Sequence, residues 1–144
     1  MKIHLATDHA GFEHKEVLKS HLLEKGYEVV DHGPNKLDEN DDYPDFITPC
    51  AQAIASSLED KAIIFGGSGE GEAMCANRIK GVRAVVYYGG STDILIFSRD
   101  HNDANILSIG ARFIDAEEVP DIVQTWLDTP FSGNERHFRR LGKF

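Results

Sequence analysis

The chain has 144 residues, of which 41% are hydrophobic and 27% are charged, and its formal net charge is −9. This length suits a single domain, residues 1–144, with a hydrophobic core of its own. The acidic excess argues against binding to nucleic acid or to an anionic membrane surface. A protein of this charge that binds an anionic ligand has to gather its cations at one place.

Neither a targeting segment nor a membrane span is expected. Asp8 and His9 interrupt the N-terminal apolar stretch before it reaches the length of a signal-peptide core. No apolar stretch approaches the length of a membrane span. The two cysteines, Cys50 and Cys75, provide no disulfide framework and suit a reducing compartment. We therefore expect a cytoplasmic protein with reduced thiols.

The first half of the chain alternates predicted strands and helices. In chain order it contains a strand over 2–7, a helix over 12–25, a strand over 27–31, a loop over 33–42 and a helix over 44–58. Gly26 is suited to end the first helix. Pro44 suits the first turn of the second helix, whereas Pro49 is unfavourable inside it.

The second half continues the alternation. It contains a strand over 61–65, a helix over 72–79, a strand over 82–88, a helix over 91–99, a strand over 106–109, a helix over 119–127 and a basic tail over 132–144. Five alternations of strand and helix are typical of a parallel sheet with helices on both faces. The predicted fold class is therefore α/β: a three-layer α/β/α Rossmann-like fold with a five-stranded parallel sheet and a C-terminal helical tail.

A glycine-rich loop follows the predicted strand 61–65. Gly66, Gly67, Gly69 and Gly71 lie within six residues and lead into a helix. Glycine lets the backbone approach a ligand closely, and amides that open into a helix N-terminus attract anions. The loop lacks the Lys-Ser/Thr of a phosphate-binding P-loop, and Glu72 stands where a dinucleotide fingerprint needs its third glycine. A small anionic ligand is predicted here, with a tight structural turn as the alternative.

Other polar groups also follow strands or lie at a helix end, and each has an alternative interpretation. Asp8 and His9 suit proton transfer or phosphate contact, or simply a helix cap. His101, beside Asn102, suits a functional role or a solvated helix end. Arg136, His137 and Arg140 suit a phosphate clamp on one helix face or a solvated basic tail.

The cysteines are interpreted as structural, and no metal site is predicted. The seven histidines show no metal-ligand spacing with Cys50 or Cys75. Cys50 lies among apolar residues of a predicted helix, and Cys75 lies three residues after Glu72 in another. Neither cysteine follows a predicted strand directly.

The ordered set of motifs resembles the ribose-5-phosphate isomerase B family, which includes isomerases of galactose 6-phosphate and allose 6-phosphate. The resemblance runs nearly end to end. It rests on Asp8-His9-Ala10-Gly11, Asp42-Tyr43-Pro44-Asp45, Gly66-Gly67-Ser68-Gly69-Glu70-Gly71-Glu72, Ala76-Asn77-Arg78, Gly81-Val82-Arg83-Ala84, Ser98-Arg99-Asp100-His101-Asn102-Asp103-Ala104-Asn105, Gly110-Ala111-Arg112 and Arg136-His137.

The resemblance implies an aldose–ketose isomerase of the pentose phosphate pathway that needs no metal or organic cofactor. It implies a sugar-phosphate substrate and a cis-enediolate intermediate, with His101 as the ring-opening acid, Asp8 as its partner and Ser68 helping protons move between O1 and O2. The implied substrate contacts are His9, Tyr43, Gly67, Gly69, Glu70, Gly71, Asn77 and Asn102. The implied phosphate contacts are His9, Arg112, Arg136, His137 and Arg140.

One departure from the family pattern assigns the base. Many members have a catalytic cysteine where this chain has Gly66, whereas a second subgroup has Gly-Gly-Ser-Gly-x-Gly-Glu and uses the glutamate. This chain matches the second form, which implies that Glu72 is the base. The resemblance also implies a homodimer or homotetramer with active sites shared between chains, in which His101, Asn102 and Arg112 face a neighbour's glycine loop.

Two rival functions stay open at this stage. One is an isomerase of a hexose 6-phosphate, allose or galactose, because one sequence does not reveal which sugar length the loop 33–43 and the tail accept. The other is a non-catalytic module that binds a sugar phosphate through the same loop. Such a module has no need for a carboxylate at Glu72 together with His101.

Overall fold

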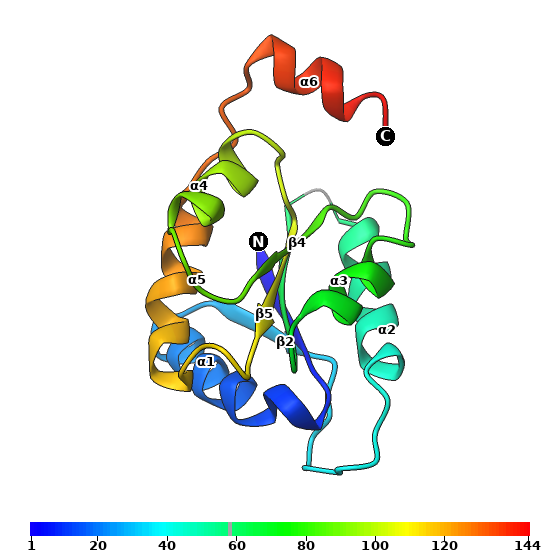
Figure 1. The fold of residues 1–144 in the computed structure, drawn as a ribbon, viewed down its shortest axis with the longest axis vertical. Helices are drawn as coiled ribbons and strands as arrows, with labels where there is room; N and C mark the ends of the chain where they lie inside the picture. The colour runs from blue at the N-terminus through cyan, green and yellow to red at the C-terminus, as the bar shows by residue number, and fades with distance from the viewer. Residues whose placement is uncertain (58) are drawn as a thin grey trace.

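Five parallel strands form the centre of the computed structural model, which describes residues 1–57 and 59–144 (Figure 1). The strands are β1 (Lys2–Ala6), β2 (Glu28–Asp31), β3 (Lys61–Gly66), β4 (Ala84–Tyr87) and β5 (Ile106–Gly110). Their order across the sheet is β2-β1-β3-β5-β4, and every neighbouring pair is parallel. The predicted α/β class and five-stranded parallel sheet are therefore confirmed.

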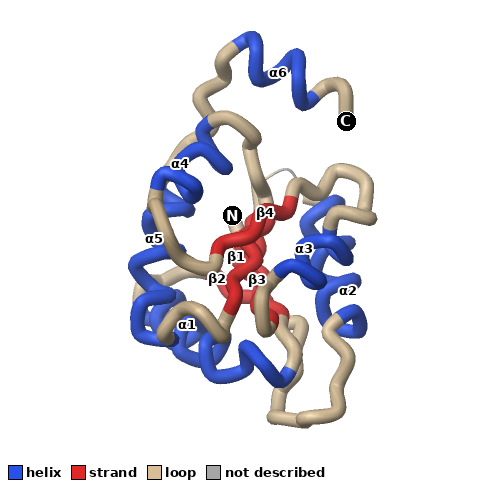
Figure 2. The backbone as a smooth tube through the Cα atoms, viewed as in Figure 1, coloured by secondary structure: helices blue, strands red, loops and turns tan. Residues whose placement is uncertain are grey.

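Helices cover both faces of the sheet (Figure 2). One face carries α1 (Phe12–Glu24), α4 (Asp93–Asp100) and α5 (Val119–Asp128), and the other carries α2 (Pro44–Ala55) and α3 (Glu70–Ala76). Side chains alternate along a strand, so Ile63 and Phe65 of β3 are buried in the first core, and Ala62 and Ile64 in the second. A strand buried on both faces is apolar throughout, as the sequence of β3 indicates.

Several helix boundaries differ from the predictions, and those of α3 do so for local reasons. The helix α3 begins two residues early, because Gly69 has a φ of 79° and directs the chain into the helix. It also ends early, where the side chain of Asn77 binds the backbone of Ala84. The helix α2 ends at Ala55, and the predicted end, Leu58, lies outside the described residues. Pro49 does not interrupt α2.

The basic tail forms the helix α6 (Glu135–Leu141), which stands apart from the three layers (Figure 1). Asn134 caps it by accepting a hydrogen bond from the amide of Arg136, at 3.1 Å. Phe138 and Phe144 are 59% and 86% exposed, so this end of the chain presents apolar surface. Within residues 1–57 and 59–144, no helix has both the length and the apolar character that a membrane crossing requires.

A histidine pair between β1 and the chain after β2 makes folding sensitive to acid. Nδ1 of His4 lies 2.8 Å from Nε2 of His32, and the rings stack. Burial lowers the pKa of both histidines. His4 lowers the pKa of His32 further, and Asp60 partly opposes the lowering at His4. The unfolded chain, with ordinary histidine pKa values of about 6.5, therefore binds protons that the folded chain does not.

We expect the free energy of unfolding to fall as the pH drops from about 7.5 to about 5.5. The urea midpoint should be lower at about pH 5.5 than at about pH 7.5, and His32→Gln should show a smaller decrease over the same interval. Other histidines titrate in both proteins, so the comparison isolates the pair. An equal decrease in both proteins would contradict this account.

Candidate active site

The site lies at the carboxyl edge of the sheet, where β1 and β3 are neighbours. From these two strands the chain proceeds to opposite sides of the sheet, which creates a crevice suited to ligands. Asp8 and His9 follow β1, and the glycine loop follows β3. The structure therefore brings together the two groups that the sequence placed after separate strands.

The neighbouring strand β5 holds the glycine loop. The amides of Ala111 and Arg112 donate to the carbonyls of Gly66 and Gly67, at 2.9 and 3.1 Å. The hydroxyl of Ser108 donates to the carbonyl of Gly69, at 2.6 Å. These hydrogen bonds engage carbonyl groups of the loop and hold its backbone against β5 and the residues that follow it. The loop is thus a rigid support for a ligand.

Glu72 is buried directly over Gly66. Its side chain belongs to the first turn of α3 and is 5% exposed. A Cβ atom added at Gly66 would overlap the Glu72 carboxyl group. A cysteine side chain at position 66 and the Glu72 carboxyl group in its present position would therefore overlap. This overlap gives a physical reason for glycine at position 66.

The surroundings of Glu72 make it a better base than a glutamate in water. Burial raises the pKa of its carboxyl group, and the negative charge of Asp8 raises it further, whereas a backbone hydrogen bond opposes them. Asp8 is 8% exposed and accepts a hydrogen bond from the amide of Ala10, at 2.9 Å. Two carboxyl groups with different environments thus face the same crevice.

Tyr43 and Arg112 lie against the glycine loop from two sides. The Tyr43 hydroxyl is 2.9 Å from where a Cβ atom at Gly71 would be, and Cζ of Arg112 is 3.1 Å from the corresponding position at Gly67. Arg112 was expected to face a neighbour's loop, but it contacts the loop of its own chain because β5 lies beside β3. Ser68 belongs to the same loop, and its hydroxyl accepts a hydrogen bond from the amide of Glu70, the first residue of α3.

His9 is paired with Asp41, which the sequence analysis did not single out. Nδ1 of His9 is 2.7 Å from Oδ1 of Asp41, and the His9 amide donates to the same oxygen at 3.0 Å. This hydrogen bond raises the pKa of His9, and the negative charges of Asp8 and Asp41 raise it further. Burial and the positive charge of Arg112 lower the pKa and so oppose the shift. In a run of exposed acidic residues, no local signal distinguished Asp41.

A metal ion would find ligand atoms at this corner. Asp8, His9 and Asp41 each offer one ligand atom, and the three lie within 4.8 Å of one another. However, the hydrogen bond between His9 and Asp41 engages Nδ1, and the raised pKa of His9 favours the protonated ring, which is a poor ligand. The contacts therefore favour an ion pair over a metal site.

His101 and Asn102 lie at the opposite edge of the sheet. The helix α4 starts after β4 and returns to the edge where β5 begins, so its last residues are remote from the glycine loop. The His101 ring stacks on Phe97 and on His137, with centroids 4.8 and 4.5 Å apart. Its nearest carboxylate is Asp100, at 3.1 Å. The implied pairing of His101 with Asp8 is not made within one chain.

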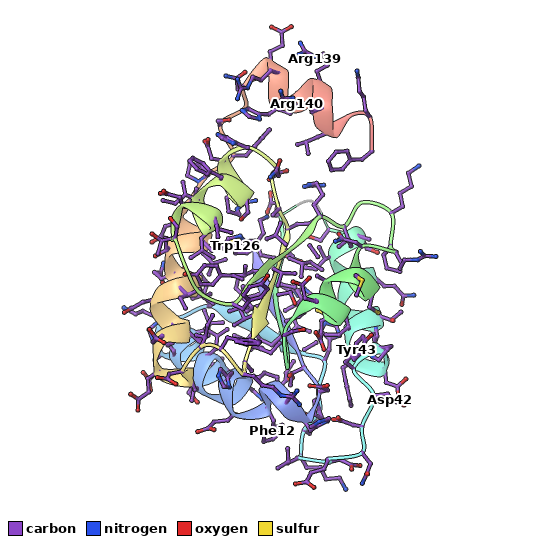
Figure 3. All side chains as sticks on the ribbon, in the orientation of Figure 1. Phe12, Asp42, Tyr43, Trp126, Arg139 and Arg140 are labelled. Atoms are coloured by element: carbon purple, nitrogen blue, oxygen red, sulfur yellow. The ribbon has the colours of Figure 1, made fainter. Side chains whose placement is uncertain are left out.

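The tail residues lie near His101. Arg136 and Arg140 are exposed on α6, whereas His137 is 5% exposed. Burial lowers the pKa of His137, and His101 and the two arginines lower it further. Within one chain, His137 is therefore a buried stacking partner of His101, and its phosphate contact stays a prediction. Figure 3 shows Arg140 near the top of the molecule and Tyr43 in its lower half.

Asn77, a predicted substrate contact, is engaged with the backbone of β4 within one chain. It lies at the far end of α3 from Glu72, and its amide group donates to and accepts from the backbone of Ala84, at 2.9 and 2.8 Å. Both polar atoms are thus used to hold the start of β4. Asparagine often makes such local bonds, which look the same in sequence as a ligand contact.

The cysteines lie away from the crevice. Cys50 is fully buried, and burial raises its pKa to about 12. Cys75 lies 3.5 Å from the Thr48 hydroxyl. Neither follows β3, so their structural interpretation fits the geometry. The carboxyl edge instead combines the buried Glu72 carboxyl group, the glycine loop and two basic side chains, His9 and Arg112.

The molecule is thus a small α/β protein with a glycine-rich loop and polar side chains at the switch point of its sheet. The Ribose/Galactose Isomerase family model matches residues 3–144, and the chain belongs to this family. Ribose-5-phosphate isomerase B of Mycolicibacterium paratuberculosis is 36% identical over 98% of this chain and 87% of its own length.

Solved structures of relatives agree over nearly the whole chain. Ribose-5-phosphate isomerase B of Mycoplasma genitalium with bound ribulose-5-phosphate matches with a TM-score of 0.92 and 39% identity, covering 99% of this chain and 92% of that one. The isomerase of Thermotoga maritima matches with a TM-score of 0.90 and 45% identity, covering 99% and 95%. The resemblance seen in the sequence is therefore confirmed at the level of family and fold.

Proposed function

We propose that this protein is an aldose–ketose isomerase that interconverts ribose 5-phosphate and ribulose 5-phosphate in the pentose phosphate pathway. The observation that carries the proposal is the buried Glu72 carboxyl group over Gly66, beside the amides of the glycine loop. Membership in the isomerase family and the relative with bound ribulose-5-phosphate support it. Cytoplasmic location and independence of cofactors remain part of the proposal.

The reaction moves one proton between adjacent carbons. After ring opening, Glu72 removes the proton from C2, and the electron pair of that bond forms the C1–C2 double bond of the enediolate while O1 becomes negatively charged. The proton then returns to C1, and a proton moves from O2 to O1 with help from Ser68. C2 is thereby oxidised from an alcohol to a ketone while C1 is reduced from an aldehyde to an alcohol, so the reaction needs no external oxidant or reductant.

The glycine loop suits the negative charge of the intermediate. Amides of Gly67 to Gly71, held by β5, would donate to the enediolate oxygens without having to reorganise. The raised pKa of Glu72 makes it a stronger base for the weakly acidic C2 proton. His9 and Arg112 supply positive charge for the phosphate at the same edge.

A complete site requires a second copy of the chain. His101 and Asn102, together with Arg136 and Arg140, lie at the edge opposite Glu72 in one chain. A symmetric dimer that places this edge against a neighbour's crevice would supply the ring-opening acid and two more phosphate cations. Exposed apolar side chains, including Phe97 and Phe138, accompany these residues. A homodimer or homotetramer with shared sites is therefore part of the proposal.

A substrate panel tests the activity and its sugar length. We expect ribose 5-phosphate to give a higher kcat/KM than allose 6-phosphate or galactose 6-phosphate, each measured by the formation of the ketose. A higher value for a hexose phosphate would favour the hexose isomerase instead. Binding of all three without turnover would favour a non-catalytic module.

A further inference from the structure

The loop between β2 and α2 places one acidic side chain against His9. Oδ1 of Asp41 accepts two hydrogen bonds from His9, one from the backbone amide and one from Nδ1, at 3.0 and 2.7 Å. The Asp41 side chain is 8% exposed, and its Oδ2 has no partner among the described residues. Asp41 is therefore a buried carboxylate that has His9 as its hydrogen-bonding partner.

The base of this loop is anchored independently of the site. Nζ of Lys15 is fully buried and donates to both carboxylate oxygens of Asp31, at 3.0 and 2.8 Å, and to the carbonyl of Pro34 at 3.0 Å. Lys19 adds a bond to Asp31 at 2.7 Å. These bonds fix the chain where the loop begins, so the contact of Asp41 with His9 is made from a supported segment.

The contact also sets the state of the His9 ring. Because Nδ1 faces a carboxylate, it carries a proton, and Nε2 is left for another partner. The charged groups around His9 are Asp8 and Asp41, which favour the imidazolium, and Arg112, which opposes it. The side chain of His9 is 33% exposed, so the chain does not enclose the ring and leaves it room for a ligand.

We propose that Asp41 is a positioning residue that holds His9 as an imidazolium whose Nε2–H donates to the phosphate of the substrate. The identity of the ligand rests on the proposed function, whereas the pairing of Asp41 with His9 does not. The carboxylate acts through His9, so its removal weakens phosphate binding rather than the proton transfer at C1 and C2. The effect depends on pH, because it concerns the proton on His9.

Asp41→Asn tests the pairing without substrate. In wild-type protein with ¹⁵N-labelled histidine, the His9 signals, assigned with His9→Asn, should titrate at a higher pH than in Asp41→Asn. The direction follows because the amide keeps the shape of the side chain but removes its negative charge. Asp38→Asn, which removes a charge from the same loop at an exposed position, should leave the His9 titration as in the wild type.

Kinetics then test the link to the substrate. From about pH 6 to about pH 8.5, the ratio of KM for ribose 5-phosphate in Asp41→Asn to that in wild type should rise by about five- to tenfold. Ionisation of the substrate cancels in this ratio. The value of kcat should change less than about twofold, since the phosphate is remote from the reacting carbons.

Each outcome decides one part of the proposal. An unchanged His9 titration in Asp41→Asn would overturn the pairing. A shifted titration with a KM ratio that does not vary with pH would overturn the link from His9 to the phosphate. If wild-type protein turns over no ribose 5-phosphate, the proposed function fails, and the NMR titration still decides the pairing.

Discussion

Glu72→Gln is expected to lower kcat for ribose 5-phosphate by about a thousandfold or more, with KM changed by less than about threefold. Glutamine has nearly the same shape and fits over Gly66 without new overlap, so the crevice should stay intact. Its amide cannot accept the C2 proton at neutral pH. The loss should therefore fall on the chemical step and spare substrate binding.

A solvent isotope experiment makes this result specific to proton transfer. In D₂O, wild-type protein should place deuterium on C1 of the ribulose 5-phosphate that it forms, because Glu72 exchanges with solvent between the two half-steps. Glu72→Gln should form neither the ketose nor the label at a comparable rate. Retained turnover with label incorporation would remove Glu72 from the mechanism.

A matched control distinguishes the loss of a catalytic base from the loss of a negative charge at a helix N-terminus. Glu13 lies in the first turn of α1, as Glu72 does in α3, but it is exposed and makes no contact with the glycine loop. Glu13→Gln removes the same interaction with the helix dipole, worth roughly 0.3–1 kcal/mol of stability. It should leave kcat unchanged, whereas a fall comparable to that of Glu72→Gln would indicate a general effect of the lost charge.

The fold could be predicted from local pattern, but its arrangement could not. Alternating apolar strands and helices identify a parallel sheet, and the strand over 61–65 matches β3 closely. The order of the strands depends on crossovers, and no residue within a strand specifies its neighbour. The start of α3 was misplaced because Glu70 and Gly71 resemble loop residues until the conformation of Gly69 is known.

The candidate site was predicted unevenly for a related reason. Glu72 and the glycine loop are contiguous in sequence, so their pattern shows in a single stretch. The bond from Asp41 to His9 spans 32 residues and comes from an acidic run whose members look alike. His137 has the spacing of a phosphate ligand, but its burial against His101 could not be read from that spacing.

Mixing two inactive variants is expected to restore activity if sites are shared between chains. Glu72→Gln and His101→Asn should each be nearly inactive alone. In a symmetric mixed dimer, one site receives Glu72 from one chain and His101 from the other, and the second site receives both substitutions. Random refolding of an equal mixture makes half of the dimers mixed, so activity should return to about a quarter of the wild-type value.

The double variant supplies the opposite test. Mixed with an equal amount of wild-type protein, Glu72→Gln/His101→Asn should leave about a quarter of the wild-type activity, because each site of a mixed dimer carries one defect. If each site belonged to one chain, this mixture would keep about half, and the two single variants would not rescue each other. Circular dichroism and gel filtration check that the His101→Asn chain folds and associates, since its ring stacks on Phe97 and His137. The separation of His101 from Glu72 within one chain makes the shared-site result the expected one.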